Sequence, residues 1–415
     1  MSPLFLFGLS GGLHLYVVVR IVPSLPGPVS SWLLGLLLLA SALLAPLGLL
    51  SRRFATPPLA DRLAWAGLLA MGLFSSLLVM TVLRDAVLLL TAAAELVWPR
   101  LAPTGLGAVT AAAVPLLAVA ASLVGAFNAR RTAGVVTVEV PIAGLPAALH
   151  GFTMAQISDI HIGPTIKRAY LQDIVDAVNR LQPDLVAVTG DLVDGSVAEL
   201  GGHVAPLGGL VSRHGTFFVT GNHEYYSGAL PWVAELRRLG ITVLMNEHVV
   251  LERQGAHLVL AGVPDFSAHH FHASHKSDPA AAMEGAPANA SVRVLLAHQP
   301  RTAAAAELAG FDLQLSGHTH GGQFLPWVFF VRLQQPFTAG LHRLGRLWVY
   351  VSRGTGYWGP PKRLGAPSEI TMLRLVTAQS RGTGRLLHGG KVPSHMDELG
   401  RGQKLAVQGM KTWPA

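Results

Sequence analysis

The chain has 415 residues, of which 51% are apolar (Ala, Val, Ile, Leu, Met, Phe, Trp, Tyr and Cys) and only 13% are charged. This composition, with a mean hydropathy of +0.44, excludes a disordered chain or a nucleic-acid-binding tail and disfavours a wholly soluble protein. The net charge of +8 fits Lys and Arg side chains at a lipid surface, and the lack of cysteine excludes disulfides, thiolate zinc sites and cysteine nucleophiles.

The first third of the chain contains four long apolar segments. They are Leu4–Val22, Trp32–Leu50, Leu63–Leu83 and Leu106–Phe127. Each has about 20 residues, enough for a helix to cross roughly 30 Å of hydrocarbon. Four such segments exceed the needs of a soluble core, so we predict a membrane domain over residues 1–131. A fifth apolar segment, Ala86–Trp98, is shorter and contains Glu95, which is typical of an interfacial or re-entrant helix.

Basic residues are distributed unevenly around these segments. With four spans, one side of the membrane carries Arg52, Arg53, Arg62, Arg130 and Arg131. The positive-inside rule places that side in the cytoplasm, together with both termini and the second half of the chain. If the fifth apolar segment were also a span, the second half would lie outside.

After residue 134, short β-rich segments alternate with amphipathic ones. Strands are predicted at Val135–Val140, Phe152–Ile157, Leu185–Thr189, Phe217–Thr220 and Thr242–Met245, and helices at Arg168–Leu181 and Leu230–Leu239. Further strands are predicted at His257–Val263, Val292–Ala297, Leu313–Ser316, Leu347–Ser352 and Glu369–Leu375. This order predicts an α/β domain with two packed sheets over residues 134–377. We expect a surface loop at Asp265–Ala290 and a flexible, polar, Gly-rich tail at 378–415.

Polar motifs directly follow five of the predicted strands. They are Asp159-Ile160-His161, Gly190-Asp191, Gly221-Asn222-His223-Glu224, Ala297-His298 and Gly317-His318-Thr319-His320. The carboxyl ends of strands are where α/β sheets place their sites. Asp, Asn and His offer oxygen and imidazole ligands, which suit Mn²⁺, Fe²⁺, Zn²⁺ or Mg²⁺. Each motif alone is more often an ordinary turn, but all five in this order predict a metal site.

The spacing within the motifs suggests how the ligands converge. Asp159 and His161 differ by two positions, so an extended backbone would direct both side chains to one side. His318 and His320 repeat this spacing, and the glycines beside the motifs allow tight turns. The carboxylate of Asp191 can bridge two cations. Two ions about 3.5–4 Å apart can clamp a phosphoryl group and stabilise both the attacking and the leaving oxygen.

The ordered motifs resemble those of the calcineurin-like metallophosphoesterase superfamily: Asp-x-His, Gly-Asp, Gly-Asn-His-Asp/Glu, His and Gly-His-x-His. The resemblance covers Val135–Val376 and includes all five motifs. The variant Gly317–Gln323, with Ser352–Gly356 and Glu369-Ile370, is most similar to the membrane-linked branch. That branch includes YkuE-type and YaeI-type phosphodiesterases and transmembrane proteins with a metallophosphoesterase domain. The chain also resembles enzymes that cleave the pyrophosphate of UDP-2,3-diacylglucosamine. The expected fold is a four-layer αββα sandwich of two mixed sheets.

The resemblance also implies a ligand set. One metal ion would be held by Asp159, His161, Asp191 and His320, and a second by Asp191, Asn222, His298 and His318. His223 would lie near the leaving oxygen and protonate it or steady the phosphoryl charge. Glu224 and Asp194 are candidates for orienting the site. The implied reaction is an in-line attack of metal-bound hydroxide on phosphorus, without a covalent enzyme intermediate.

We therefore expect a membrane-anchored enzyme that uses two divalent ions to hydrolyse a phosphodiester or pyrophosphate. The expected partners are the lipid bilayer and a phosphorylated lipid or envelope precursor, and nucleic acid is not among them. The main alternative is a membrane receptor or scaffold whose metallo-domain binds a phosphorylated ligand without turnover. The complete motif set argues against it. A transporter with an accessory hydrolase receives little support from four spans with few internal polar groups.

Three further signals leave alternatives open. A solvated loop or a lid over the substrate is predicted for His269, His270, His272 and His275. Either protein core or an apolar wall facing lipid and acyl chains is predicted for Trp327, Phe329, Phe330 and Trp358. Substrate-phosphate binding or surface salt bridges are predicted for Arg353 and Arg363.

Overall fold

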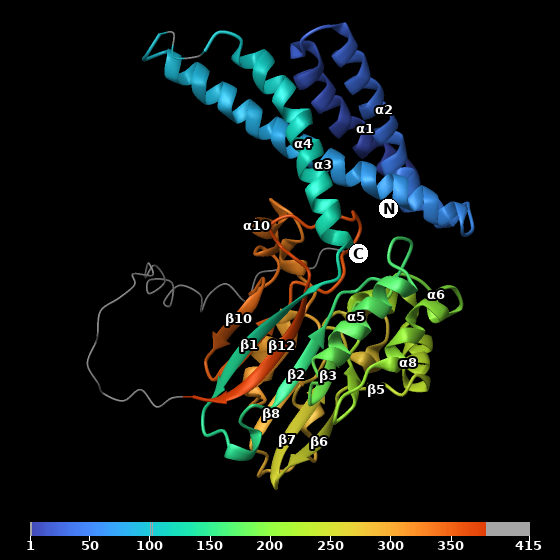
Figure 1. Cartoon of the computed structure of the whole chain (residues 1–415), viewed down its shortest axis with the longest axis vertical. Coiled ribbons are helices and arrows are strands. Elements are labelled where there is room, and N and C mark those ends of the chain that lie inside the picture. The colour runs from blue at the N-terminus through green and yellow to red at the C-terminus, as the bar shows by residue number, and fades with distance from the viewer. Residues whose placement is uncertain (1, 100, 102, 379–415) are drawn as a thin grey trace. The chain divides into compact units, whose positions relative to one another are not determined.

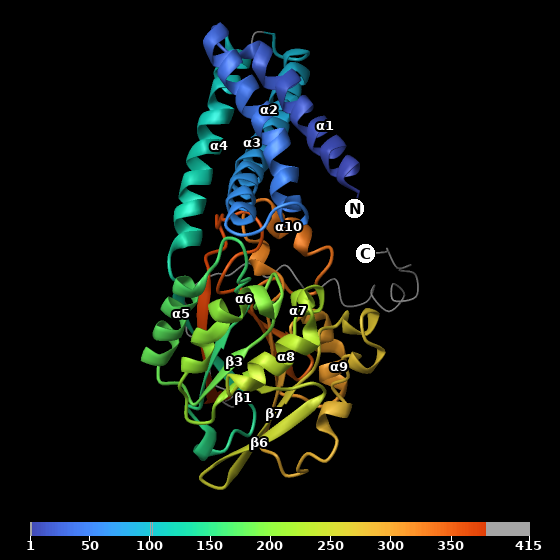
Figure 2. The same ribbon diagram turned by 90° about the vertical axis from the view of Figure 1, so that its right-hand side faces the viewer.

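The computed structural model describes residues 2–99, 101 and 103–378, and Figures 1 and 2 show its elements from two sides. Apart from residue 378, the tail expected at 378–415 lies outside the described residues. The first part of the chain forms α1 (Pro3–Ile21), α2 (Pro28–Leu50), α3 (Leu59–Glu95) and α4 (Leu106–Arg130). All four helices are long and apolar enough to cross a membrane.

Helix α3 differs from the prediction. The sequence predicts separate segments at Leu63–Leu83 and Ala86–Trp98, but the structure has one helix of 37 residues that continues through both. Neither charged residue at the junction breaks a helix, and both find partners in the bundle. Arg84 donates to the carbonyl oxygen of Arg20 (3.2 Å), and Arg20 donates to the carboxylate of Asp85 (2.7 Å). The charged pair therefore belongs to an interhelical network and does not end a span.

The second part of the chain forms two six-stranded mixed sheets. The first has the order β1-β12-β2-β3-β4-β5, and the second β10-β11-β9-β8-β7-β6. The first sheet comprises β1 (Gly134–Ile142), β2 (Thr153–Ile157), β3 (Leu185–Val188), β4 (Thr216–Phe218), β5 (Thr242–Val243) and β12 (Glu369–Thr377). The second comprises β6 (Glu247–Arg253), β7 (Ala256–Gly262), β8 (Val292–Leu296), β9 (Leu313–Ser316), β10 (Gly340–Leu344) and β11 (Leu347–Val351). Strands β6 and β10 at the edges of the second sheet were not predicted.

The layers confirm the predicted αββα sandwich. An apolar core between the sheets draws on Met154 and Phe217 from the first sheet and on Leu260 and Leu315 from the second. Helices α5 (Arg168–Arg180), α6 (Val197–Val204) and α8 (Ala229–Arg238) lie on the first sheet's outer side (Figure 1). The short helix α9 (Ala303–Leu308) contacts β10 and β11 of the second sheet. In α5 the apolar residues recur at helical spacing, so that one face packs against the sheet.

Polar contacts join the helix bundle to the α/β part. Arg52, directly after α2, donates to the carbonyl oxygen of Asp194 (2.9 Å). Lys362, in the loop before β12, donates from Nζ to the carbonyl oxygen of Gly72 in α3 (2.9 Å). A Cβ atom on Gly125 of α4 would lie 2.6 Å from Cγ of Lys362, so the lysine needs a glycine there. These contacts hold the helices close to one edge of the sheets.

Candidate metal centre

The carboxyl ends of five strands bring the predicted motifs together. Strands β2, β3 and β4 are parallel neighbours in the first sheet, as are β7, β8 and β9 in the second. Because parallel neighbours end at the same edge, motifs far apart in the sequence meet there. His161 and His320, for example, are 159 positions apart in sequence, yet their Nε2 atoms lie 3.0 Å apart.

The first group of candidate ligands comprises Asp159, His161 and His320. Their candidate ligand atoms lie within 4.8 Å of one another, and all three residues are buried. His320 Nε2 lies 3.5 Å from Asp159 Oδ1. Two imidazole nitrogens and a carboxylate oxygen face one another here, and a divalent cation between them would accept an electron pair from each. The structure thus assembles three of the four ligands expected for the first ion.

The second group comprises Asp191, His298 and His318. His298 Nε2 lies 3.1 Å from Asp191 Oδ2 and 3.2 Å from His318 Nδ1. Asp191 Oδ2 also lies 3.9 Å from Nε2 of His161, which belongs to the first group. The carboxylate of Asp191 therefore faces both groups, as a bridging ligand must.

Asn222 is the remaining expected ligand, and its side-chain oxygen lacks a hydrogen-bond donor among the described residues. The residue is 8% exposed and lines the same cavity as Asp191 and His318. Among the described residues, nothing donates a hydrogen bond to its buried Oδ1 atom. Leaving such an atom unsatisfied costs about 1–3 kcal/mol, whereas a cation would satisfy it. Together with the imidazoles and carboxylates, this oxygen makes the donor set fit divalent metal ions.

The backbone is left-handed at five of the seven candidate ligands. The φ angle is +53° at Asp159, +57° at His161, +52° at Asp191, +70° at His318 and +50° at His320. This conformation is uncommon outside glycine, costs of the order of 1–3 kcal/mol per residue and clusters at functional sites. The prediction that an extended backbone directs the paired ligands to one side is therefore wrong. Tight turns after the strands bring them together.

Glycines make room for the two carboxylates. A Cβ atom on Gly317 would lie 2.1 Å from Oδ2 of Asp159, and one on Gly221 would lie 2.2 Å from Oδ1 of Asp191. The space lets the backbone approach closely, so that the amide of His318 donates to Asp159 Oδ1 (2.9 Å). These contacts orient the carboxylates before any ion binds.

Glu224 ties two of the ligand-bearing loops together. Its buried carboxylate accepts hydrogen bonds from the backbone N–H groups of Gly221 (2.6 Å), Asp191 (2.9 Å) and Leu192 (2.7 Å). Burial and the nearby Asp191 carboxylate raise the pKa of Glu224 to about 8, although the backbone donors favour its charged form. Glu224 thus positions the turn after β3 against the turn after β4.

His223 lies beside both groups with its ring held by Asp194. Its Nδ1 atom lies 2.5 Å from Asp194 Oδ1, which in turn lies 3.3 Å from Nδ1 of His161. Burial alone would lower the pKa of His223, but the carboxylates of Asp191 and Asp194 raise it to about 9. These carboxylates favour the protonated imidazole, and Nε2 is the nitrogen that remains available to a substrate.

The other imidazoles of the centre differ in charge. Burial disfavours a charge on His298, but Asp191 and Asp159 raise its pKa well above its usual range. Burial and the neighbouring His298 lower the pKa of His318 to about 3. Burial, with His161 and Arg363 nearby, lowers the pKa of His320 well below its usual range. His318 and His320 are therefore unprotonated, which metal ligation requires.

Two aromatic residues also line the cavity over the centre, which has a volume of about 350 Å³. The sequence did not assign either of them to the centre. The ring centroids of Trp358 and Tyr226 lie 5.5 Å and 5.2 Å from that of His223. Tyr226 follows the Gly221–Glu224 motif within the short helix α7 (Asn222–Ser227), so the motif gave a signal for it. No sequence motif marked Trp358 as part of the centre.

The exposure of four aromatic side chains settles one open alternative. The relative exposure is 44% for Trp327, 63% for Phe329, and 53% for both Phe330 and Trp358. The interpretation that they belong to the protein core is therefore wrong. The first three lie on the short helix α10 (Trp327–Val331). An apolar wall remains the interpretation that fits.

Of Arg353 and Arg363, only Arg363 contacts a candidate ligand. The buried guanidinium of Arg363 donates to the carbonyl oxygens of His320 (2.9 Å) and Arg353 (2.7 Å), and Nη2 lies 3.2 Å from His320 Nδ1. Arg353 pairs with Glu369 at 2.7 Å. Arg363 is therefore neither a surface salt-bridge residue nor positioned for substrate, and it orients His320.

Part of the histidine-rich loop lies next to the centre. His269 and His270 line a cavity of about 280 Å³ that also includes Asn222 and His318. His275 lies farther along the loop, where its Nδ1 atom is 2.9 Å from the hydroxyl of Tyr225. The loop therefore borders the candidate site.

Comparisons with known proteins agree with this geometry. The family model described as calcineurin-like phosphoesterase matches residues 152–322, which include all five motifs. The chain is 44% identical over 268 residues to the "Transmembrane protein with metallophosphoesterase domain" of Bos taurus, covering 62% of this chain and 60% of that protein. It is 34% identical over 227 residues to an "Uncharacterized metallophosphoesterase" of Aquifex aeolicus, covering 54% of this chain and 84% of that protein.

A third relative belongs to the branch suggested by the sequence. "Uncharacterized metallophosphoesterase YkuE" of Bacillus subtilis is 30% identical over 242 residues, covering 56% of this chain and 81% of that protein. The chain spans less than two thirds of the length of the bovine relative.

Proposed function

This chain belongs to the calcineurin-like metallophosphoesterase family, and we propose that it is a membrane-anchored enzyme that hydrolyses a phosphodiester or pyrophosphate bond with two divalent metal ions. The observation that carries the proposal is the position of Asp191. Its carboxylate faces ligand groups on two sides, 3.1 Å from His298 Nε2 and 3.9 Å from His161 Nε2. The orphaned oxygen of Asn222 beside it supports a cation there.

The residues divide into two ligand sets. One ion would be held by Asp159, His161, Asp191 and His320, and the other by Asp191, Asn222, His298 and His318. Bound in these positions, Mn²⁺, Fe²⁺, Zn²⁺ or Mg²⁺ would activate water and offset charge on the phosphoryl oxygens. The bridging carboxylate would keep the two ions at a fixed separation.

His223 is the proposed proton donor. Asp194 holds its Nδ1 atom, so that Nε2 can face the phosphoryl group in the cavity. Water attacks phosphorus in line with the leaving oxygen and forms a new P–O bond while the bond to the leaving oxygen breaks. His223 donates its proton to that oxygen, and the attacking water releases a proton to solvent. Proton transfer of this kind contributes about 10²–10⁴-fold to a rate.

The four apolar helices would anchor the enzyme as a multi-pass membrane protein. The continuous helix α3 supports four spans, an even number, with the α/β part on the same side of the membrane as the start of α1. Arg52 after α2 and Arg130 at the end of α4 both contact the α/β part, at Asp194 and Thr165. By the positive-inside rule, these arginines support a cytoplasmic position for the catalytic part. Its closeness to the helix ends supports a lipid or envelope precursor as substrate.

The enzymatic proposal is tested with the full chain purified in detergent. With Mn²⁺ present, it should hydrolyse bis-p-nitrophenyl phosphate, and a chelator should abolish this activity. Asp191→Asn should be inactive, whereas Asp173→Asn, which changes an exposed aspartate on α5, should match the unchanged protein. A receptor or scaffold would bind without turnover. Activity that is absent throughout, or that survives Asp191→Asn, would contradict the proposal.

A further inference from the structure

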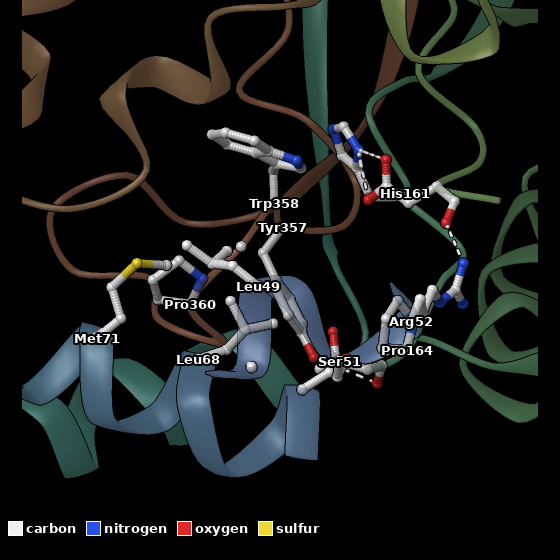
Figure 3. A pocket seen from close by; sticks show the side chains of 15 residues that line it. Leu49, Ser51, Arg52, Leu68, Met71, His161, Pro164, Tyr357, Trp358 and Pro360 are labelled. Atoms are coloured by element: carbon white, nitrogen blue, oxygen red, sulfur yellow. Dashed lines mark hydrogen bonds and ion pairs between the residues drawn. The ribbon is translucent and has the colours of Figure 1, made fainter. Parts of the chain in front are cut away.

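An apolar cavity lies between the metal centre and the membrane helices. It has a volume of about 240 Å³, and Figure 3 shows the side chains that line it. On the side of the metal centre, its wall includes His161, Asp194 and Trp358. On the helix side, Leu49, Leu68 and Met71 form an apolar part, and Ser51 and Arg52 form a polar rim in which Arg52 donates to the carbonyl oxygen of Asp194. Because the helix-side wall belongs to α2 and α3, the cavity connects membrane-spanning segments with the catalytic part.

The helix-side wall reaches the outer surface of the bundle. Leu49 lines the cavity but is 53% exposed, and it lies in the last turn of α2, a candidate span. Residues that are exposed on membrane-spanning helices face lipid. Water bound against the apolar part of the wall, at Leu49, Leu68 and Met71, gains little there, and a methylene chain that displaced it would remove this apolar surface from water. The cavity is therefore suited to the end of an acyl or alkyl chain near its phosphate group.

A polar cavity lies on the other side of the centre. It has a volume of about 280 Å³ and contains Arg301, a permanent cation. Gln335 also lines it, and its side-chain oxygen is buried without a hydrogen-bond donor among the described residues. The residue is 5% exposed. An arginine and an unpartnered acceptor suit a group that carries both negative charge and hydroxyl or N–H donors.

The cavities share lining residues around the metal centre. Trp358 lines both the apolar cavity and the cavity over the centre. Asn222 and His318 line both the polar cavity and the cavity over the centre. The three cavities are therefore neighbours, with Trp358 at the boundary on one side and Asn222 and His318 at the boundary on the other.

We propose, on the basis of the hydrolase function above, that the substrate is an amphiphilic phosphoester bound across the metal centre. Its apolar chain lies in the cavity beside α2 and α3, and its polar group lies beside Arg301 and Gln335. The scissile phosphoryl group is held between them, next to His223. Leu49 and Met71 select for the chain, and Arg301 selects for the polar group. This arrangement gives the helix bundle a part in substrate binding in addition to anchoring.

A second apolar cleft offers a different position for the chain. It has a volume of about 370 Å³, lies between Trp358 and helix α10, and includes Trp327 and Val331. The cavity beside α2 and α3 is favoured because its wall is built from candidate membrane spans, whereas α10 has only five residues. The experiment distinguishes the two positions.

The test uses the full chain in detergent with Mn²⁺ and a series of p-nitrophenyl phosphodiesters. The second ester group runs from methyl to decyl, so every substrate releases the same leaving group. For chain lengths at which each added methylene group still fits in the cavity, kcat/KM should rise by roughly three- to fourfold per methylene, mainly because KM falls. Leu49→Trp and Met71→Trp, which reduce the cavity, should each lower the ratio of kcat/KM for the octyl and methyl esters by about tenfold.

Matched variants control for effects on the bundle. Leu43→Trp changes another leucine of α2 that is similarly exposed, at 49%, but is not part of the cavity, and it should leave the octyl-to-methyl ratio unchanged. Arg301→Gln should raise KM for a p-nitrophenyl phosphodiester that carries a second phosphate group as well as its alkyl chain. Arg346→Gln changes an arginine in a separate cavity and should leave the KM for this substrate unchanged.

The possible outcomes separate this inference from the proposed function. If the methyl ester is not hydrolysed at all, the hydrolase function fails. If it is hydrolysed but chain length has no effect, or Leu49→Trp and Leu43→Trp behave alike, the substrate orientation is wrong while the function stands. If Val331→Trp lowers the octyl-to-methyl ratio and Leu49→Trp does not, the chain lies in the cleft beside α10, which also overturns the assignment.

Discussion

The metal centre and the helix bundle both bury polar side chains, but the bundle pairs polar groups in its interior with one another, whereas the centre gathers unpaired ligand atoms in one place. In the bundle, His14 is within hydrogen-bond distance of Ser41 through Nε2 (2.9 Å) and of a backbone carbonyl through Nδ1 (2.8 Å). Thr81 donates to the carbonyl oxygen of Leu77. In the centre, by contrast, imidazoles face one another and Asn222 Oδ1 has no donor among the described residues.

This difference separates structural from functional polar groups. A buried polar network that satisfies itself fixes how helices pack, and it needs no ligand. A cluster that cannot satisfy itself is stable only with an added ion or water. Substitutions in the bundle should therefore affect stability first, whereas substitutions in the centre should affect activity and metal binding first. The predictions below test this division, from the largest expected effect to the smallest.

The largest effect is expected at His223. His223→Ala should lower kcat by about 10²–10⁴-fold for a phosphodiester with an alkoxide leaving group, because the leaving oxygen loses its proton donor. The loss should be much smaller for bis-p-nitrophenyl phosphate, whose nitrophenolate leaves without a proton. The thermal unfolding midpoint should change little, because the ring packs at the edge of the cavity. Enzyme assays and thermal unfolding of the full chain in detergent measure both quantities. His150→Ala, at an exposed position, serves as control, and a loss below tenfold at His223 with the alkoxide leaving group would remove the proposed role.

Metal binding should stabilise the folded chain. At a free Mn²⁺ concentration about 100 times Kd, the ion should add about 2.7 kcal/mol to the free energy of unfolding. The thermal midpoint should rise accordingly in the unchanged protein and rise less in Asp191→Asn. Equal rises in the two proteins would show that the ion binds elsewhere.

A bundle substitution should show the opposite pattern. Arg84→Met removes donors that bind the carbonyl oxygens of Arg20 and Gly107, and should lower the free energy of unfolding by about 1–3 kcal/mol. The value of kcat for bis-p-nitrophenyl phosphate should remain within twofold of the unchanged protein. Arg131→Met, at an exposed position after α4, provides the matched control. A loss of activity without a loss of stability would contradict the division drawn here.

The smallest effect concerns pH. Asp191 and Asp194 raise the pKa of His223 to about 9, so the proton donor is charged below that pH and activity should fall as pH rises through it. Asp194→Asn removes one of the two carboxylates and should move this fall to lower pH. The measurement is the pH profile of kcat/KM. A profile that stays in place would show that another group controls the basic limb.

The sequence predicted the composition of the site because the motifs fall at strand ends. Once Phe152–Ile157 and Leu185–Thr189 are recognised as parallel strands, Asp159 and Asp191 must lie at the same edge of the sheet. The order of the elements predicted that a second sheet packs on the first, but not the approach that brings His298 up to Asp191. The physical cause of this approach is the apolar core between the sheets, and periodicity along the chain does not show which faces meet.

Other features could not be predicted because they depend on contacts between distant residues. The spacing of Asp159 and His161 does not reveal that both have positive φ angles. The charges of Arg84 and Asp85 suggested the end of a span, since their partner Arg20 on α1 is far away in the sequence. Trp358 has no motif, and the fold alone brings it next to His223.

The most direct test of the central claim is the metal content and magnetic coupling of the full chain loaded with Mn²⁺. Elemental analysis should find two ions per chain, and electron paramagnetic resonance should show an exchange-coupled pair. In Asp191→Asn the coupled spectrum should disappear, because the bridging carboxylate is lost. A single ion per chain, or two ions without coupling in the unchanged protein, would contradict the account.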